Sequence, residues 1–457
     1  MASTYLTRTN GSAVTAERRT FTISFWLKRS AVGTEHALCS AGNGGGSEEF
    51  AIRIRNDDTI EVWHYDGSSF VGRKRTNRVL RDTNAWYHIF CQYDTTESTA
   101  DDRIKFYING VRETSFADSV NPTLNDNTSW NVDERHQIGS NSWGNSGNGS
   151  SLLNGCMSHF YNVAGSIIDI NQFGSTDSTT GEWKINTNPT IASYGTAGFL
   201  VLKDGNTATD QSPNSNNFTV GGTLTKTEDC PSNVFATLNP LIVNRLDNNN
   251  TLSYGNNRQT TVSISGSYVA SPSTLGMTSG KYYAEMKVTT LASNCFVGID
   301  GQAVYTATQG INMGYSPYGY CYAQWGGKYN NGTSVSGAGN TFTTGDIIGI
   351  AVDMDNLKVY FSKNGVWQNS GDPTSGSTGT GAFYTIAAVD TLSEGAYHFE
   401  ATNNDADGAS IWDWNFGNGY FGTTAVSSAG TNASGIGIFE YDVPTGYTAL
   451  STKGLNL

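Results

Sequence analysis

The sequence predicts an all-β protein built from two tandem antiparallel β-sandwich (jelly-roll) domains joined by a polar linker. Glycine is abundant (53 residues), proline is scarce (9 residues), and short apolar segments alternate with stretches of Asn, Ser and Thr, as expected for many strands joined by turns. One hairpin pattern also occurs twice, at residues 103–111 and 357–366. In both copies apolar and polar residues alternate and an Asn-Gly pair follows, which suits the type I′ turn of a two-residue β-hairpin.

The first domain is expected over residues 21–204, after an N-terminal arm at residues 1–20. The arm has weak strand signal and no heptad repeat, which argues against a coiled-coil shaft. The domain opens with a core strand, because Phe21, Ile23 and Phe25 share one strand face. Its other expected strands lie at residues 50–54, 59–64, 86–93, 103–108 and 155–161.

A linker is expected at residues 205–240, where the composition shifts to Asp, Ser, Asn, Pro and Thr around one short strand at residues 218–220. The second domain is expected over residues 241–457. Its clearest strand segments are residues 280–288, 295–299, 347–352, 357–363, 396–400 and 412–416. Because no helical period of about 10 to 15 residues separates them, antiparallel sandwiches are favoured over βαβ units.

The charge of the chain bears on its partners. With 27 basic and 40 acidic residues the net charge is −13, which weighs against binding to nucleic acid or to anionic membranes. No stretch approaches the roughly 20 apolar residues of a membrane span, and residues 1–8 lack the apolar core of a signal peptide. We therefore expect a chain that matures in the cytosol or leaves the cell by lysis, with no export signal and no membrane span.

The six cysteines are widely spaced, show no Cys-x-x-Cys pair and lie mostly in apolar strand segments, so we expect buried thiols rather than disulfides or a zinc site.

Five segments of the first domain follow one another in a familiar order. They are Phe25-Trp26, Trp86-Tyr-His88, the hairpin at residues 106–111, Ile138-Gly139 and residues 155–161. In this order they resemble the laminin-G-like, concanavalin A-type lectin and glucanase domains. The resemblance implies a jelly-roll sandwich.

The second domain carries a more specific set of motifs. They are Gly280-Lys-Tyr-Tyr-Ala-Glu285, residues 345–350, residues 353–361, Lys363-Asn-Gly-Val-Trp367 and Asn415-Phe-Gly417. Together they resemble a SPRY domain, whose loops at one end of the sandwich bind partners.

The segments between and after the domains resemble those of one class of proteins. Residues 173–183, 210–219 and 230–240, with the ending at residues 444–455, resemble marine bacteriophage virion proteins that join these same two folds. The resemblance implies a structural or adhesive protein on the virion surface, in a capsid decoration or a tail or head appendage. Its partners would be other virion proteins and a host-surface glycan or protein receptor. Homotrimers are common among such appendages, although no motif of this sequence encodes one.

Catalytic motifs are absent from the sequence. Laminarinase-like glucanases need a Glu-x-Asp-x-x-Glu strand that presents nucleophile and acid on one face, and the chain contains no such string. It also lacks a Gly-x-Ser-x-Gly elbow, a Walker loop and a His-Glu-x-x-His motif. We therefore expect no enzymatic activity and no cofactor, and a polysaccharide depolymerase is disfavoured.

Two aromatic stretches are candidates for sugar recognition, in which rings stack on pyranose faces and nearby polar groups bind hydroxyls. The first contains Trp130 and Trp143 among Asn, Ser and Gly. The second, residues 315–331, contains Tyr318, Trp325 and Tyr329, of which Trp325 and Tyr329 are expected to be the exposed rings. The alternative is that Tyr318 shares a strand face with the next two alternate tyrosines and fills the core.

One basic cluster stands out in this acidic chain. Its members are Arg73, Lys74, Arg75, Arg78 and Arg81. The alternation favours a solvated strand or loop, and the alternative is a docking patch for an acidic neighbour on the particle.

Laminin-G-like domains often hold calcium in their loops, and Asp94 with Asp101 and Asp102 marks a place where such a site could form. Acidic hairpin loops are more often simply solvated.

The leading hypothesis is thus a non-enzymatic virion surface protein that binds a host glycan or protein. Its rival is a purely structural decoration or assembly protein that binds only other virion subunits. In the first case the loop aromatics should matter for function, and in the second the basic cluster.

Overall fold

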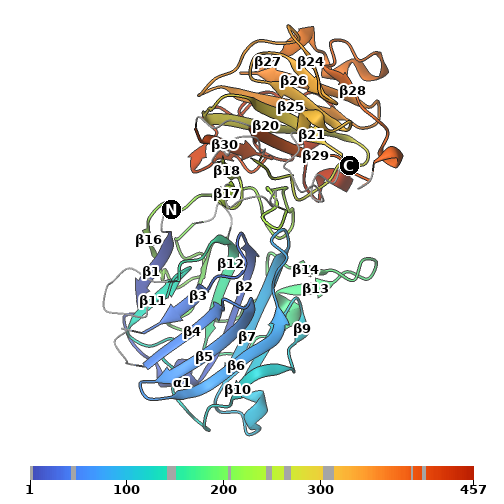
Figure 1. The fold of residues 1–457 in the computed structure, drawn as a ribbon. Helices are drawn as coiled ribbons and strands as arrows, with labels where there is room; N and C mark the ends of the chain where they lie inside the picture. Colours follow the sequence, from blue (N-terminus) through green and yellow to red (C-terminus); the bar gives the residue numbers. More distant parts are fainter. Residues whose placement is uncertain are drawn as a thin grey trace. The chain divides into compact units, whose positions relative to one another are not determined.

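Strands dominate the chain, and in the computed structural model they form two separate sandwiches (Figure 1). The structure describes residues 4–42, 48–141, 151–203, 207–242, 250–261, 269–301, 313–392, 395–403 and 408–456. The chain divides into two compact units, Met1–Lys226 and Thr227–Leu457, and each is described by itself. The prediction of an all-β protein made of antiparallel sandwiches is confirmed, since among the described strand pairs only β20 with β33 is parallel.

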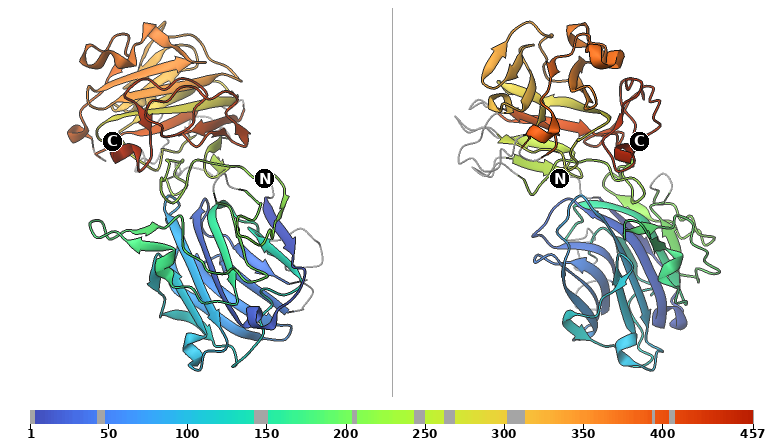
Figure 2. Two further views of the ribbon diagram at one scale, coloured as in Figure 1. Left: turned by 180° about the vertical axis from the view of Figure 1, so that it is seen from behind. Right: turned by 90° about the vertical axis from the view of Figure 1, so that its right-hand side faces the viewer.

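The N-terminal unit contains an eight-stranded and a six-stranded sheet, seen from two further sides in Figure 2. In spatial order the eight-stranded sheet consists of β10 (Phe116–Val120), β6 (Phe70–Val79), β5 (Thr59–Asp66), β4 (Glu48–Ile54), β3 (His36–Ala41), β11 (Arg135–Ile138), β1 (Tyr5–Thr9) and β16 (Thr219–Gly221). The six-stranded sheet consists of β15 (Phe199–Val201), β12 (Gly155–Ala164), β2 (Thr20–Arg29), β7 (Trp86–Asp94), β8 (Ile104–Ile108) and β9 (Val111–Arg112). A short hairpin, β13 (Gly174–Thr176) and β14 (Trp183–Ile185), and one helix, α1 (Thr15–Arg19), complete the described regular elements of this unit apart from short 3₁₀ turns.

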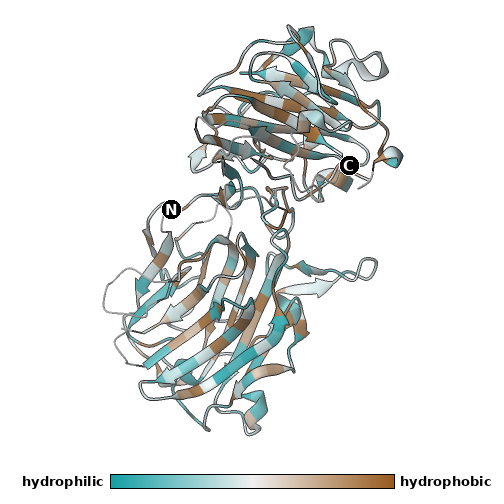
Figure 3. Ribbon diagram, in the orientation of Figure 1, coloured by the Kyte–Doolittle hydropathy of each residue, from teal (hydrophilic) through white to brown (hydrophobic). Residues whose placement is uncertain are grey.

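The core of this unit lies between the two sheets. Phe21, Ile23 and Phe25 of β2 are fully buried on one face, as their alternation predicts. The ring of Phe21 meets that of Phe50, from the opposite sheet, at 5.6 Å between centroids. Brown and teal residues alternate along many strands in Figure 3, which is the hydropathy pattern of strands with one buried face.

Strand β1 lies inside the eight-stranded sheet, although its residues carry weak strand signal. It pairs on one side with β11, where Leu6 faces Ile138, and on the other with β16, where Tyr5 faces Gly221. The short strand predicted at residues 218–220 is therefore present as β16, within the N-terminal sheet.

The C-terminal unit has a nine-stranded and a six-stranded sheet, with a two-stranded hairpin beside them. The main path of the nine-stranded sheet is β17 (Asn250–Ser253), β18 (Arg258–Thr261), β30 (Ser410–Asn415), β20 (Lys281–Thr290), β25 (Ile347–Asp353), β26 (Lys358–Lys363) and β27 (Val366–Trp367), with β28 (Tyr384–Thr385) on β26 and β33 (Thr448–Ala449) on β20. The six-stranded sheet consists of β19 (Val269–Ala270), β29 (His398–Asn403), β21 (Cys295–Asp300), β22 (Gly319–Ala323), β23 (Lys328–Asn330) and β24 (Thr333–Val335). The hairpin is β31 (Tyr420–Phe421) with β32 (Thr424–Ala425).

Short 3₁₀ turns join the strands of both units. The described ones are η1 (Ala100–Asp102), η2 (Ile170–Gln172), η4 (Met313–Tyr315), η5 (Gln368–Ser370), η6 (Pro373–Thr378), η7 (Val389–Thr391) and η8 (Gly454–Asn456).

Both Asn-Gly hairpins form as predicted. Asn109 and Gly110 have φ of 49° and 78°, and Asn364 and Gly365 have the same pair of values. Two consecutive positive-φ residues are the signature of the type I′ turn, which matches the twist of the flanking strands. The first turn joins β8 to β9 and the second joins β26 to β27.

A buried carboxylate ties the C-terminal segment of the second unit to the outer face of the nine-stranded sheet. Glu285 of β20 accepts hydrogen bonds from the backbone N–H groups of Glu440 and Tyr441 at 2.8 and 2.9 Å. Tyr283 and Asn415 donate to the same carboxylate. Burial raises the pKa of Glu285 to about 7, against the lowering effect of these donors.

The cysteines and histidines of the described chain are mostly internal. Four thiols, Cys39, Cys91, Cys295 and Cys321, are buried, and none of the six cysteines forms a disulfide. The histidines at positions 36, 64, 88 and 136 are also buried, as expected for core or sheet positions. In the described part of the chain, no helix is both long and apolar enough to cross a bilayer.

Candidate ligand-binding surfaces

Four aromatic side chains line up on the outer face of the six-stranded sheet of the C-terminal unit. Phe296 comes from β21 and Tyr329 from β23, whereas Trp325 lies in the turn between β22 and β23 and Tyr315 ends η4. Phe296 faces outward because Cys295 and Val297, its neighbours in the strand, belong to the core. We call Trp325, Phe296, Tyr329 and Tyr315 the aromatic row.

Successive rings of the aromatic row are in contact. The ring of Trp325 meets Phe296 edge-on at 5.3 Å between centroids, and Phe296 stacks on Tyr329 at 5.2 Å. Tyr329 meets Tyr315 edge-on at 5.4 Å. These spacings are those of favourable aromatic pairs, so each ring holds its neighbour in place.

The two ends of the row are open to solvent. Tyr315 is 51% exposed and Trp325 is 38% exposed. Among the described residues no other Phe, Tyr or Trp reaches this degree of exposure. The most exposed aromatic rings of the described chain therefore lie at the two ends of this row, whereas Phe296 between them is 3% exposed.

Two glycines leave room for the rings of the aromatic row, and a hydrogen-bonded glutamine side chain holds the turn that carries Trp325. A Cβ at Gly314 would collide with the ring of Tyr329, and a Cβ at Gly327 would lie 2.6 Å from the indole nitrogen of Trp325. The Gln324 side chain accepts a hydrogen bond from the backbone N–H of Cys295 at 2.9 Å. The turn that carries Trp325 is thus tied to β21 beneath it.

Hydroxyl groups border the row. Ser334 of β24 lies directly opposite Tyr329 in the register, so both side chains point to the same face. All three residues of β24 are exposed, and β24 is the last strand of the sheet. Rings next to exposed hydroxyls and an open sheet edge can stack on a ligand and bind its polar groups.

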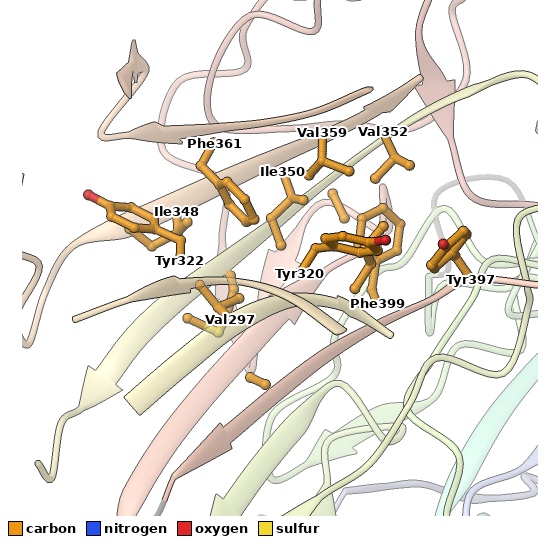
Figure 4. Close-up of a cluster of buried hydrophobic side chains, with 14 of the residues drawn as sticks. Val297, Tyr320, Tyr322, Ile348, Ile350, Val352, Val359, Phe361, Tyr397 and Phe399 are labelled. Carbon is orange, nitrogen blue, oxygen red and sulfur yellow. The ribbon is translucent and has the colours of Figure 1, made fainter. Parts of the chain in front are cut away.

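The row contains two of the predicted site residues, Trp325 and Tyr329, the second partly buried by its stacking on Phe296. Tyr318 is not part of it, because its side chain packs against the core. The next two alternate tyrosines, Tyr320 and Tyr322, are core residues and lie among the buried side chains of Figure 4.

Phe296 and Tyr315 were not among the predicted site residues. The alternation of β21 is the signal that could have identified Phe296, since it places this ring on the face opposite the core residues Val297 and Ile299.

The prediction that Trp130 binds a ligand is wrong. Its side chain is 0% exposed, packs against Phe50 at 5.3 Å, and donates its indole N–H to Asn162 at 3.0 Å. A residue that fills the core and satisfies its only donor internally cannot stack on a sugar at the surface. Trp143, the other candidate of this stretch, lies outside the described residues.

The basic cluster does not form one docking patch. Arg73 and Arg75 share the outer face of β6, where Arg73 binds the buried carboxylate of Glu61 at 2.8 Å and both arginines pair with Asp118. Lys74 points to the opposite face, as the pleat requires. The other two arginines, Arg78 near the end of β6 and Arg81 beyond it, also bind carboxylates. These contacts are Arg78 with Glu113 at 2.7 Å and Arg81 with Asp58 at 2.9 Å.

The three acidic residues suggested for calcium do not converge. Asp94 accepts hydrogen bonds from the hydroxyls of Thr20 and Thr96. Asp102 pairs with Arg112 at 2.6 Å, and Asp101 accepts from an asparagine amide at 2.6 Å. Across the described residues no three His, Cys, Asp or Glu side chains are grouped so that they could hold a metal ion. The three carboxylates therefore do not form one shared set of calcium ligands.

Comparison with known protein families bears out both domain resemblances. Residues 2–161 match the concanavalin A-like lectin/glucanases superfamily, and residues 281–403 match the SPRY domain. No curated protein matches the chain.

Among solved structures, the SPRY domain of human HERC1 shares 16% identity with a TM-score of 0.27, covering 39% of this chain and 96% of that one. A heptameric SAP-like pentraxin from Limulus polyphemus shares 11% identity with a TM-score of 0.30, covering 49% and 90%. The CBM40 domain of the Ruminococcus gnavus IT-sialidase shares 14% identity with a TM-score of 0.25, covering 36% and 90%. From the two family matches, the chain contains a concanavalin A-like domain followed by a SPRY domain.

Proposed function

We propose that the protein is a non-catalytic adhesin that binds a cell-surface glycan on the aromatic row of its C-terminal unit. The observation that carries the proposal is that the two most exposed aromatic rings of the described chain, Tyr315 and Trp325, belong to one contiguous row. Isolated exposed apolar residues need no functional explanation, but these two exposed rings are held together by one packed cluster, through the buried Phe296 and the partly buried Tyr329.

The chemistry of the row suits a saccharide. Pyranose rings present apolar C–H faces that stack on aromatic rings, and their hydroxyls need nearby donors and acceptors. Ser334 and the other exposed residues of β24 supply hydroxyl and backbone groups beside Tyr329. Because ring contacts and underlying glycines hold the row in place, little side-chain entropy is lost on binding.

We further propose that the particle carrying this adhesin is a bacteriophage, with the protein on the virion surface. This part of the proposal is supported by the resemblance of the connecting and terminal segments to phage virion proteins. Absence of the protein from purified particles, tested by immunogold labelling, would contradict it.

The glycan proposal is tested by titrating the full-length protein with host-surface polysaccharide and following the intrinsic tryptophan fluorescence. Trp325→Ala and Tyr315→Ala should each raise Kd about tenfold, which corresponds to about 1.4 kcal/mol, the order expected for one lost stacking contact. Tyr315→Ala retains Trp325 as the fluorescent reporter, and Trp325→Ala is followed by calorimetry.

The matched control is Val366→Ala, which truncates a 65% exposed apolar side chain of the same unit outside the row. This variant should bind like the wild type. Unchanged affinity in both row variants, with tight binding by the wild type, would show that the glycan binds elsewhere. If the polysaccharide became shorter during the titration, the proposal that the protein is non-catalytic would be contradicted.

A further inference from the structure

A cavity opens in the N-terminal unit, at the side where the edges of its two sheets meet. It has a volume of about 350 Å³ and is lined by residues of β6, β8, β9, β10 and η1 and of the segment between β9 and β10. Of these elements, β6, β9 and β10 are labelled in Figure 1. Its lining residues are Lys74, Asp101, Ile104, Arg112, Glu113, Thr114, Phe116 and Ser119. The volume falls at the small end of the range of about 300–1,000 Å³ that is usual for ligand pockets.

Lys74 is the buried charge of this cavity. Its side chain is 4% exposed, and the ammonium donates one hydrogen bond, to the hydroxyl of Ser119 at 2.7 Å. The nitrogen also lies 5.1 Å from the centre of the Phe116 ring, in a cation–π arrangement. An ammonium group has three donors, so the hydrogen bond to Ser119 leaves two N–H groups for a ligand.

The other charges around the cavity are neutralised by close partners. Arg112 pairs with Asp102 at 2.6 Å, and Glu113 pairs with Arg78 at 2.7 Å. The carboxylate nearest to Lys74 is Asp101, at 3.9 Å. It is 82% exposed, so solvent screens this pair. Burial lowers the pKa of Lys74, which is the expected sign for an ammonium with too little counter-charge.

We propose that this cavity binds a small organic monocarboxylate of monosaccharide size, with the carboxylate on the Lys74 ammonium and Arg112 at the rim. The proposal concerns a different unit and does not depend on the function proposed for the aromatic row.

The lining selects among anions. A phosphate or sulfate dianion would bring two charges next to the carboxylates of Asp101 and Glu113, whereas a monoanion matches the one uncompensated charge of Lys74. Ser119, Thr114 and Glu113 can hydrogen-bond ligand hydroxyls, and Ile104 with Phe116 offers an apolar wall. A hydroxylated ring with one carboxylate, such as a uronic acid, combines these features.

The test uses D-glucuronate as the probe and the full chain, with affinity measured by calorimetry and ligand stabilisation by the shift in Tm. Glucuronate should bind the wild type saturably, and Lys74→Met should weaken binding at least tenfold. Lys74→Met replaces a buried ammonium by an apolar chain of similar length, and its Tm without ligand reports whether it folds. Arg112→Met, at a side chain that is 39% exposed, should weaken binding several-fold and serves as a second variant.

The matched control is Lys184→Met, which removes an exposed, ion-paired lysine of the same unit away from the cavity. It should bind glucuronate like the wild type. Trp325→Ala, which changes the aromatic row and not the cavity, should also bind glucuronate like the wild type. Methyl glucoside and sulfate at equal ionic strength are tested on Trp325→Ala, in which the aromatic row is interrupted, and should give no shift.

Wild-type binding of glucuronate that is unaffected by Lys74→Met, or an equal response to methyl glucoside or sulfate, would overturn the proposal. Absence of glucuronate binding at millimolar concentration would also overturn it.

Discussion

Mild acid should selectively unfold the N-terminal unit, because this unit buries several neutral histidines. Burial lowers the pKa of His36 and His136 to about 4 and that of His88 to about 3. The two nitrogens of His88 are committed to neighbours, since Nδ1 accepts from the indole of Trp183 at 3.0 Å and Nε2 lies 2.9 Å from the hydroxyl of Ser24. A second ring proton would break the contact with Trp183.

The size of the effect follows from proton linkage. Because these imidazoles bind protons more weakly in the folded unit than in the unfolded chain, their stabilisation is complete above pH 6.5 and is lost as the pH falls towards 4. At pH 5 each histidine costs about 2 kcal/mol relative to pH 7, and three together cost about 6 kcal/mol. Glu49 of the same unit, whose pKa burial raises to about 7, acts in the opposite direction and offsets about 2 kcal/mol of this loss. The remaining loss of about 4 kcal/mol is a large part of the total stability of about 5–15 kcal/mol of an ordinary domain. His64 is left out of this sum because Asp126, 3.7 Å away, would share its added charge.

The buried cysteines allow each unit to be followed separately. The full chain is equilibrated in urea at pH 7, 6 and 5, pulsed with a methanethiosulfonate reagent, and analysed by mass spectrometry. Labelling of Cys39 and Cys91 reports unfolding of the N-terminal unit, and labelling of Cys295 and Cys321 reports unfolding of the C-terminal unit. We expect the urea midpoint of the first pair to fall steeply between pH 7 and pH 5.

The variant His88→Gln keeps a hydrogen-bonding group but cannot take up a proton, so it should remove about 2 kcal/mol of the pH-dependent loss. A midpoint for Cys39 and Cys91 that stays constant or rises on acidification would refute the reasoning.

Three further predictions concern single positions. In the C-terminal unit the sign is reversed at Glu285, because its pKa is raised to about 7. Its contribution is complete below pH 4.5 and is lost as the pH rises through 7, so Glu285→Gln should abolish a fall of about 2 kcal/mol between pH 5 and pH 7, measured by the same labelling. Gly110→Ala should destabilise the N-terminal unit by more than about 1 kcal/mol in urea titrations, because φ is 78° and the added Cβ would collide with the Trp183 ring. Trp130→Ala should cost about 3–5 kcal/mol in the same titrations while leaving glycan affinity unchanged, because the ring is a core residue.

Local patterns were sufficient to predict the fold class. Alternation and turn chemistry act over a few residues, so both Asn-Gly hairpins and the core face of β2 could be identified before the structure was known. Partners that are distant in sequence could not be identified in this way. Trp130 lies in a polar stretch, and only the tertiary fold brings Phe50 and Asn162 against its ring.

The candidate sites show the same limit. Alternation places Arg73 and Lys74 on opposite faces of β6. It does not reveal that the Glu61 carboxylate pairs with Arg73, or that Lys74 lines a cavity. The aromatic row likewise depends on strand register, which brings Phe296 beside a ring more than thirty positions later in the chain, Tyr329.

The position of β1 has a consequence for synthesis. One edge of β1 pairs with β16, and Tyr5 meets Gly221 across that pair, so β1 leaves the ribosome long before its partner strand. At translation rates of about 5–20 residues per second this delay is roughly 10–45 s. During that time the eight-stranded sheet keeps an unpaired border, and nascent chains on one polysome could exchange β1 strands there. Chaperone occupancy should therefore persist on nascent chains until residue 221 has emerged.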